Sequence, residues 1–346
     1  MQKIYINGRF LTQKLTGVNR FAYEICLALA AKGVDFQIIA PKNINKNYDV
    51  SKFKMCFAGH GNSHFWEQTI LPFYFLFKKK YILINFSGLG SIFLKKQFIT
   101  IHDLSFLKNP QWFSKKYYYF YKILTPIVAK KALQILTVSH FSKKEIIKYL
   151  NINEDKISVI YNAVSEKFNN NPPLSEKKSY ILAVSSIEPR KNFERLLAAA
   201  KLLDDNIKLL VVGSTNKVFG NVDLEHNNRV DFLGYVNDDD LKKYYSEALL
   251  FVYPSIYEGF GLPPLEAMAL GCPVVLSDIE VFHEVFGEAA IYFNPYDIDD
   301  IAQKINGVLK SKETQKKLIL QGYDLVKKYD YEKSANLILS QIILIP

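Results

Sequence analysis

Residues 248–277 constrain the fold of this chain more than any other stretch. The apolar run 248–252 ends before a proline, a glycine-containing loop follows, and a second apolar run begins at residue 274. Between the runs, two prolines suit the first turn of a helix, where N–H groups have no partners, and a glycine suits its left-handed end. A strand, a loop, a helix and a strand in this order predict a parallel α/β sheet. The signals are Gly259 and Gly261 in the loop, Pro263 and Pro264 in the helix, and Gly271 after it.

The loop and the start of this helix predict an anion site. The first N–H groups of a helix are unpaired and carry partial positive charge, and glycine lets the backbone approach a ligand closely. The N–H groups around Phe260, Gly261 and Leu262 are the candidates. Glu258 and Glu266 flank them and are placed to hold sugar hydroxyls. Spacing alone leaves the alternative that Glu266 is an ordinary first-turn acid and Glu258 a solvated loop residue.

The surroundings of these two acids resemble a known family. Glu258 and Glu266 are separated by seven residues; Gly-Phe-Gly-Leu-Pro follows Glu258, and Glu266 begins the string Glu-Ala-Met-Ala. This stretch resembles the retaining, nucleotide-sugar-dependent glycosyltransferases of carbohydrate-active family 4, and most nearly the mannosyltransferases of O-antigen and capsule assembly. The resemblance implies the GT-B fold, two Rossmann-like doubly wound α/β domains facing a cleft. It also implies that Glu258 holds the donor sugar, that Glu266 holds the ribose, and that the anomeric configuration is retained.

Length predicts two domains, because 346 residues exceed the size at which a single core keeps growing. The polar, proline-containing stretch 165–178 is the expected boundary. We therefore expect an N-terminal, acceptor-side domain over residues 1–165 and a C-terminal, nucleotide-sugar-binding domain over 166–330. The family resemblance implies that the last helix, about residues 331–346, crosses back onto the first domain.

Further candidates lie in the C-terminal half. Arg190 and Lys191 precede a predicted helix, and two cations at a helix start suit a diphosphate. The string Glu-Pro-Arg-Lys-Asn resembles the family's phosphate motif, in which Lys191 contacts phosphate. Many members carry Gly-Arg where this chain has Val184-Ser185, so Arg190 is the expected substitute. The family binds its base near the turns at Ser214 and Tyr235, although Tyr235 is equally suited to packing at the rim.

Candidates in the N-terminal half follow predicted strands and turns. Gly17 precedes a helix expected over residues 19–32, and the resemblance places this loop on the donor diphosphate with Arg20 as an anion contact. The alternative is that Gly17 is an ordinary turn glycine. His102 and Asp103 end a predicted strand, where ligands gather in α/β sheets. The family places a histidine there beside the reacting sugar, so we expect His102 in the active site and Asp103 on the acceptor side.

Charge is distributed unevenly between the two halves. Residues 1–165 hold 24 Lys and Arg against 8 Asp and Glu, a net of +16, whereas the whole chain carries +10. Two stretches of this half, residues 65–80 and 112–122, are aromatic and then basic, which suits contact with anionic lipid headgroups. The alternative for either stretch is buried aromatics with a solvated lysine face. A different class, a nucleic-acid-binding protein, also fits basic and aromatic residues, but it leaves Glu258, Glu266 and Lys191 unexplained.

Other sequence features limit the expected cellular location and the class of reaction. The chain has no apolar run long enough to span a bilayer, begins with a predicted strand, and has three scattered cysteines without metal-ligand spacing. We expect a cytoplasmic protein, peripheral on the inner face of a membrane. No dinucleotide-binding glycine pattern follows the first strand, and no phosphate-loop lysine motif is present. Asp238-Asp239-Asp240 resembles a metal-binding acid pair but is better interpreted as a helix start, so we expect no metal and no cofactor other than the donor.

The sequence thus predicts a sugar transferase. The expected reaction moves a hexose, with mannose from GDP-mannose as first choice, to a growing and lipid-linked surface polysaccharide. GDP-fucose, dTDP-rhamnose or a UDP-sugar are alternative donors, and an epimerase or hydrolase on the same fold is chemically close. The expected partners are the nucleotide sugar, a glycan or lipid-linked oligosaccharide, and an anionic membrane surface, without nucleic acid.

Overall fold

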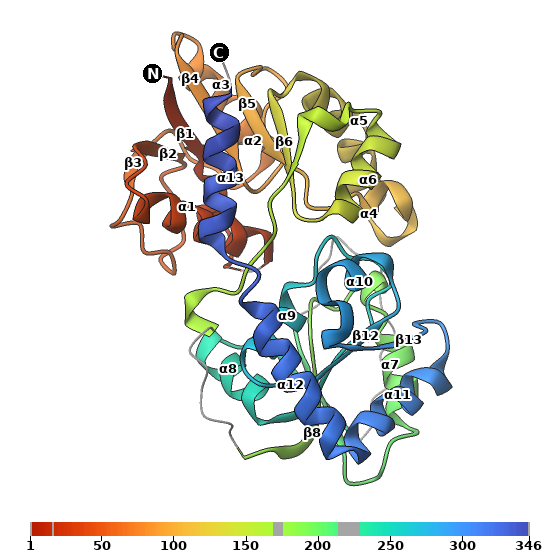
Figure 1. Cartoon of the computed structure of the whole chain (residues 1–346). Coiled ribbons are helices and arrows are strands. Elements are labelled where there is room, and N and C mark those ends of the chain that lie inside the picture. The colour runs from red at the N-terminus through yellow and green to blue at the C-terminus, as the bar shows by residue number, and fades with distance from the viewer. Residues whose placement is uncertain (1, 16, 169–175, 214–228, 345–346) are drawn as a thin grey trace. The chain divides into compact units, whose positions relative to one another are not determined.

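A computed structural model describes residues 2–15, 17–168, 176–213 and 229–344 of the chain (Figure 1). The chain forms two compact units. Unit 1 comprises Met1–Leu107, Tyr119–Asn162 and Asp330–Pro346, and unit 2 comprises Lys108–Tyr118 and Ala163–Tyr329.

Unit 1 is built on a sheet of seven parallel strands in the order β3-β2-β1-β4-β5-β6-β7. The strands are β1 (Lys3–Asn7), β2 (Phe36–Ala40), β3 (Lys54–Phe57), β4 (Tyr81–Asn85), β5 (Gln97–Thr100), β6 (Gln134–Thr137) and β7 (Ile157–Val159). The α-helices are α1 (Gly17–Ala31), α2 (His64–Gln68), α3 (Ile70–Phe75), α4 (Ser105–Lys108), α5 (Lys115–Lys131, of which the residues up to Tyr118 belong to unit 2), α6 (His140–Leu150) and α13 (Tyr331–Ile343).

Unit 2 repeats the plan with six parallel strands in the order β10-β9-β8-β11-β12-β13. The strands are β8 (Lys178–Val184), β9 (Lys208–Val212), β10 (Val230–Gly234), β11 (Ala248–Tyr253), β12 (Val274–Ser277) and β13 (Ile291–Phe293). The α-helices are α7 (Phe193–Ala200), α8 (Asp238–Glu247), α9 (Leu262–Ala269), α10 (Glu280–Phe286), α11 (Ile298–Lys310) and α12 (Lys312–Val326).

Each sheet has one point where the direction of strand order reverses. In unit 1, β1 lies between β2 and β4, and in unit 2, β8 lies between β9 and β11. The sheets are therefore doubly wound, and the predicted Rossmann-like α/β class is confirmed. Ligands of such sheets bind beyond the carboxyl ends of the strands at the reversal. Asn7 and Asn85 occupy these ends in unit 1, and Val184 and Tyr253 occupy them in unit 2.

Each unit has its own buried apolar core. In unit 2, helix α7 packs Phe193, Leu196 and Leu197 onto the sheet, as the helical spacing predicts. In unit 1, the aromatic stretch 65–80 divides: Trp66 and Phe75 are buried against β1 and β4, while other aromatic side chains of the stretch face solvent. The stretch is thus partly core and partly surface.

The C-terminal helix α13 lies along α1 within unit 1 (Figure 1). Lys32 and Glu332 form an ion pair at 2.6 Å, and Ser334 donates a hydrogen bond to the carbonyl of Tyr161 at 2.8 Å. The segment Lys108–Tyr118, by contrast, belongs to unit 2, where the ring of Trp112 lies 6.5 Å from that of Tyr257. Sequence spacing gave no sign of this second crossing.

No helix among the described residues is both long enough and apolar enough to cross a membrane.

Candidate active site

The glycine loop and helix α9 of unit 2 adopt the predicted geometry. Gly261 caps the helix with a φ of +109°, and Gly271 follows it with a φ of +69°. A Cβ at Gly261 would lie 3.0–3.2 Å from the rings of Phe282 and Phe286, so glycine is required for space as well as for backbone conformation. The loop therefore ends at a residue without a side chain, Gly261, directly before the first N–H groups of α9.

Four charged side chains gather beside this loop, and we call Glu188, Arg190, Lys191 and Glu258 the unit 2 cluster. The backbone N–H of Ile256 donates to the carbonyl of Arg190 at 2.9 Å, which joins the loop after β11 to the turn after β8. This contact brings together residues nearly seventy positions apart. The cluster lies beyond the carboxyl ends of the two strands at the sheet reversal, as a ligand site should.

Lys191 and Glu258 form the centre of the unit 2 cluster. The Lys191 ammonium donates to Glu258 Oε1 and, at 2.9 Å, to the hydroxyl of Tyr253. Arg190 donates to Glu188 at 2.6 Å and contacts the second oxygen of Glu258 at 3.4 Å. Each cation thus touches a carboxylate.

Because these groups are buried, the ionisation state of each depends strongly on the charges of its neighbours. Glu188 is fully buried, Lys191 is 5% exposed and Glu258 is 7% exposed. Burial alone would raise the pKa of Glu258, but Lys191 and then Arg190 lower it, and the net pKa lies below the usual range of a glutamate. Glu258 is therefore ionised at neutral pH and can accept hydrogen bonds from sugar hydroxyls.

Glu266 lies inside α9 and is 5% exposed. Its carboxylate accepts a hydrogen bond from the hydroxyl of Tyr245, on α8, at 3.2 Å. This contact fixes one oxygen of Glu266, so the residue is more than a solvated first-turn acid. Phe260 is buried with its ring 5.4 Å from that of Tyr329, which leaves its backbone N–H as the candidate contact to an anion.

The expected base-binding residues are less well defined. Tyr235 follows β10 and is 56% exposed. Ser214 lies outside the residues that the structure describes. The structure therefore brings together Arg190, Lys191 and Glu258, and α9 begins four residues after Glu258.

In unit 1, His102 follows β5 as predicted. Its Nε2–H donates to the carbonyl of Phe86 at 3.0 Å, and its ring lies edge-on to Phe21 at 5.1 Å. Burial lowers the pKa of His102, against smaller opposite effects of Phe86 and Asp103. The ring is therefore neutral at pH 7, and Nδ1 carries its lone pair.

The other predicted residues of unit 1 have structural contacts. Asp103 accepts hydrogen bonds from the N–H and the hydroxyl of Ser105, at 2.9 and 2.6 Å, at the start of α4. Gly17 begins α1 with a φ of +40°, which favours glycine. Arg20 is 6% exposed, and its charge acts on the hydroxyl of Tyr48.

A second group of polar side chains, which sequence analysis missed, lies beyond the carboxyl ends of β1 and β4. We call Asn7, Arg9, His64, Glu67 and Asn85 the unit 1 network. Glu67 is fully buried and pairs with Arg9 at 3.0 Å and with His64 Nδ1 at 2.6 Å. Asn7 donates to Glu67 at 2.9 Å and to Asn85 at 2.8 Å.

The unit 1 network extends to α5 and explains one glycine. His64 Nε2 lies 2.7 Å from the hydroxyl of Tyr121. Gly88, at a φ of +98°, passes so close that a Cβ there would collide with the Arg9 guanidinium and the Glu67 carboxylate. The positions of Asn7 and Asn85 at predicted strand ends were the only available signal, since Arg9 and Glu67 match no motif.

The acidic run Asp238–Asp240 begins helix α8, as predicted. Asn237 caps α8 by accepting a hydrogen bond from the N–H of Asp240 at 2.9 Å, and Asp239 pairs with Lys242 at 2.7 Å. Within the described ranges, no group of three or more His, Cys, Asp or Glu side chains is arranged to hold a metal ion. All three cysteines are free thiols.

Comparison with known proteins identifies the family of this chain. Residues 15–168 match the family model Glycosyltransferase Family 4, and residues 164–325 match Glycosyl transferases group 1. The chain is 37% identical over 250 residues to the O-antigen chain mannosyltransferase RfbU of Salmonella typhimurium, covering 71% of this chain and 69% of that protein. It is 34% identical over 260 residues to the O-antigen chain mannosyltransferase B of Escherichia coli, covering 69% and 68%.

Solved structures share the fold over the whole chain. WaaG, a glycosyltransferase involved in lipopolysaccharide biosynthesis, aligns with a TM-score of 0.75 over 99% of this chain and 100% of its own, at 14% identity. HepE of Anabaena, in complex with UDP and glucose, aligns with a TM-score of 0.74 over 100% of both chains, also at 14% identity. With two doubly wound units and both family models matched in order, this chain is a glycosyltransferase of the GT-B fold and belongs to glycosyltransferase family 4.

Proposed function

We propose that this enzyme transfers a hexose from a nucleotide diphosphate sugar to a growing surface polysaccharide with retention of anomeric configuration and without a metal ion. The unit 2 cluster beside the N-terminus of α9 carries the proposal. Breaking the glycosidic bond of such a donor leaves negative charge on a diphosphate, and fixed positive groups aimed at developing charge are usually the largest catalytic contribution. Lys191, Arg190 and the N–H groups of residues 260–262 are the candidates.

The two carboxylates then have separate roles. Glu258, held ionised between Lys191 and Arg190, binds hydroxyls of the transferred sugar. Glu266, fixed on one side by Tyr245, binds the ribose. In a front-face reaction the bond from the anomeric carbon to the phosphate oxygen breaks, and the acceptor oxygen bonds to that carbon on the same face. The departing phosphate takes the acceptor proton, so no second base is required.

Mannose from GDP-mannose is our first choice of donor. The support is that RfbU and mannosyltransferase B, both named as O-antigen chain mannosyltransferases, match this chain over about seven tenths of its length. GDP-fucose, dTDP-rhamnose and UDP-sugars are the alternatives. HepE, a relative in fold alone, is described in complex with UDP and glucose.

The proposed acceptor is a glycan of the O-antigen type, carried on a lipid. The enzyme would act on the cytoplasmic face of a membrane, to which the basic N-terminal half is attracted. His102, after β5, is the proposed catalytic residue of unit 1, beside the reacting sugar, and Asp103 and Arg20 are the proposed acceptor-side residues. His102 would meet the sugar in its neutral form.

A panel of nucleotide sugars tests the proposal. Binding of GDP-mannose, GDP-fucose, dTDP-rhamnose and UDP-glucose to the whole chain would be measured by calorimetry, with Lys191→Met as the matched control. We expect one donor to bind at least tenfold more tightly than the others and Lys191→Met to weaken it. Equal, Lys191-independent binding of all four would contradict the proposal. Turnover without acceptor, giving free sugar or an epimer as the main product, would favour the hydrolase or epimerase alternative.

A further inference from the structure

An exposed apolar group lies at the end of α3 and in the connection between β4 and β5. Phe73 is 72% exposed, Leu76 64%, Phe77 87% and Phe93 66%. Large apolar side chains exposed singly are ordinary, whereas a cluster of them marks an interaction surface. We call these four residues the apolar patch. Trp66 and Phe75, from the same stretch, are buried, so the exposure is specific to one side of the segment.

Lysines lie on one side of the apolar patch. Residues 68–102 contain five lysines and no acidic residue. Lys79, Lys80 and Lys95 are exposed, and the backbone N–H of Lys3 donates to the carbonyl of Lys80 at 3.2 Å, which adds a sixth lysine beside them. The surface is therefore apolar at one end and positive at the other.

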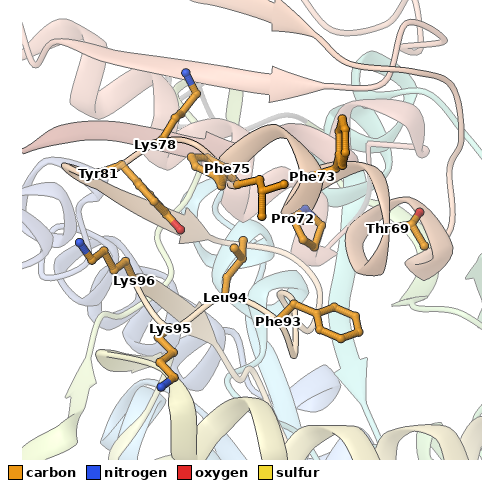
Figure 2. Close-up of a pocket in the computed structure, with 11 residues that line it drawn as sticks. Thr69, Pro72, Phe73, Phe75, Lys78, Tyr81, Phe93, Leu94, Lys95 and Lys96 are labelled. Carbon is orange, nitrogen blue, oxygen red and sulfur yellow. The ribbon is translucent and has the colours of Figure 1, made fainter.

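A cavity of about 520 Å³ opens within this surface (Figure 2). Its apolar lining includes Phe75, Tyr81 and Leu94. In Figure 2 the lysines that line it lie at one end, on the left and at the top, while Phe73 and Phe93 lie toward the other. Its volume falls within the roughly 300–1,000 Å³ of small-molecule sites. The surface therefore offers an apolar hollow beside a group of cations.

We propose that this surface docks the enzyme on an anionic lipid bilayer, with the apolar patch in the interface and the lysines on the headgroups. Aromatic side chains with basic neighbours suit the boundary between headgroups and acyl chains. Lysines near an anionic surface attract it, and apolar side chains that enter the interface add hydrophobic free energy. The proposal rests on the proposed function in that it assigns residues to the membrane partner.

Charge argues against two other occupants. A second copy docked on this surface would place lysines against lysines, which opposes self-association. A single-stranded nucleic acid would bind the cations, but its bases stack on aromatic faces, and the exposed aliphatic side chain of Leu76 offers them no stacking surface. An anionic bilayer satisfies both the lysines and the aliphatic side chain.

The docking surface and the unit 1 network occupy opposite edges of one sheet. Tyr81 begins β4 and Lys96 precedes β5, so the cavity lies at the amino ends of the strands, while Asn7 and Asn85 lie at the carboxyl ends. Strands of five residues separate the two edges by roughly 15 Å at about 3.3 Å per residue. Changes in the docking surface should therefore leave the carboxyl edge intact.

Vesicle sedimentation tests the proposal with the full-length chain. The probe is a vesicle of phosphatidylcholine with one third phosphatidylglycerol, and pure phosphatidylcholine is the neutral reference. The patch variant carries Phe73→Ser, Phe77→Ser and Phe93→Ser, and the charge variant carries Lys79→Gln, Lys80→Gln and Lys95→Gln. The matched controls, in unit 2, are Leu202→Ser with Leu320→Ser, and Lys312→Gln with Lys316→Gln and Lys317→Gln, all exposed in the native chain.

We expect the native chain and both controls to sediment with anionic vesicles at low salt and to be released at high salt. Each lysine removed should lower the partition coefficient about fivefold, and each aromatic about tenfold. Unchanged melting temperatures would show that the variants fold. Equal sedimentation of variants and controls, or equal binding to neutral vesicles, would overturn the proposal.

Two other results would also overturn it. Displacement of the chain from vesicles by oligo(dT), with binding lost in the charge variant, would assign the surface to nucleic acid. A dimer in sedimentation equilibrium that the patch variant abolishes would assign it to a second copy. Because vesicle binding requires no donor, it can fail while the nucleotide-sugar panel succeeds, and the reverse.

Discussion

The two units place buried charges at the same location of the same sheet plan, yet they use them differently. The unit 2 cluster combines two cations with two carboxylates beside the N-terminus of α9. The unit 1 network has one full cation and one carboxylate, and amide side chains satisfy most of the remaining bonds. Both lie beyond the carboxyl ends of strands at a sheet reversal.

The difference lies in what each arrangement leaves for a ligand. In unit 1, Glu67 has contacts on both oxygens and connects α2 to β1, as a structural network does. In unit 2, the helix N-terminus adds positive potential to the two cations, and an anion can share both. A buried ion pair adds little net stability, because removing both charges from water costs about as much free energy as their attraction returns. Its presence is better explained by a specific role. We infer that the unit 2 cluster is organised for substrate and the unit 1 network for architecture.

Substitution of Glu258 is the strongest test of this comparison. Glu258→Ala should lower the transfer rate about 10²–10³-fold, because in the proposed mechanism the carboxylate holds the reacting sugar and orients Lys191. Glu266→Ala should lower it about tenfold, since it removes one charged hydrogen bond to the ribose. Initial rates with the donor that the panel identifies would measure both.

Folding must be monitored in the same experiment, because Glu258→Ala leaves Lys191 buried without its carboxylate. Glu258→Gln keeps a hydrogen-bond acceptor of the same size and is the control for stability. Equal and small losses in both alanine variants, with native circular dichroism, would show that the two carboxylates do not have separate roles.

Substitution of Glu67 separates architecture from substrate binding. Glu67→Ala leaves Arg9 buried without its partner and should destabilise the chain by about 3–5 kcal/mol. Thermal unfolding would measure the loss. Glu332→Ala, which breaks the exposed pair with Lys32, is the matched control and should leave the melting temperature unchanged. Donor affinity of folded Glu67→Ala should equal that of the native chain, and a large loss would place the unit 1 network in the substrate site.

The two groups of charged residues also differ in how well they could be predicted from sequence alone. The unit 2 cluster was predictable because Arg190 and Lys191 are adjacent and Glu258 stands beside glycines, so each motif is local. The unit 1 network was not, because its members come from three separate segments and Arg9 and Glu67 resemble ordinary surface charges. Only the fold brings them together, and burial, which sequence does not report, makes them important.

Secondary structure shows the same limit. The last helix was expected over about residues 331–346 and is observed at Tyr331–Ile343, and its start is well defined because Asp330 caps it. Strands β3 and β13 have weak sequence signals, since Lys54–Phe57 is partly polar and half exposed, and Ile291–Phe293 has only three residues. The cap of α6 is Ser139, which accepts a hydrogen bond from the N–H of Ser142, although Ser142 three residues later would suit a cap equally well by residue type.

The pH dependence of stability should differ between two groups of unit 1. Burial lowers the pKa of His102, so the unfolded chain takes up a proton near pH 6.5 that the folded chain resists. Stability therefore falls as pH falls below about 6.5, with a slope of at most about 1.4 kcal/mol per pH unit. Burial would raise the pKa of Glu67, but Arg9 and His64 lower it overall, so its contribution is present above about pH 4.5 and is lost as pH falls further.

Denaturant unfolding at a series of pH values would test this order. His102→Gln should flatten the curve between about pH 6.5 and 5 and leave the loss at lower pH. The reverse result, with His102→Gln steepening the curve, would show that the folded chain holds His102 protonated. Glu67→Gln should act only on the more acidic part.

The smallest expected effect is that of metal removal. Transfer should proceed at an unchanged rate in a chelator and gain nothing from magnesium or manganese, because Lys191, Arg190 and the start of α9 supply positive charge where a metal-dependent transferase would use an ion. The acids that resemble a metal motif, Asp238–Asp240, form the first turn of α8, where Asn237 and Lys242 bind them. In the matched control, Asp239→Asn should not change activity. Rates with and without chelator, and NMR of the anomeric proton in the product, are the measurements. Activity that vanishes in chelator and returns with manganese would mean that the unit 2 cluster does not neutralise the diphosphate by itself. An inverted product would mean that its carboxylates have other roles.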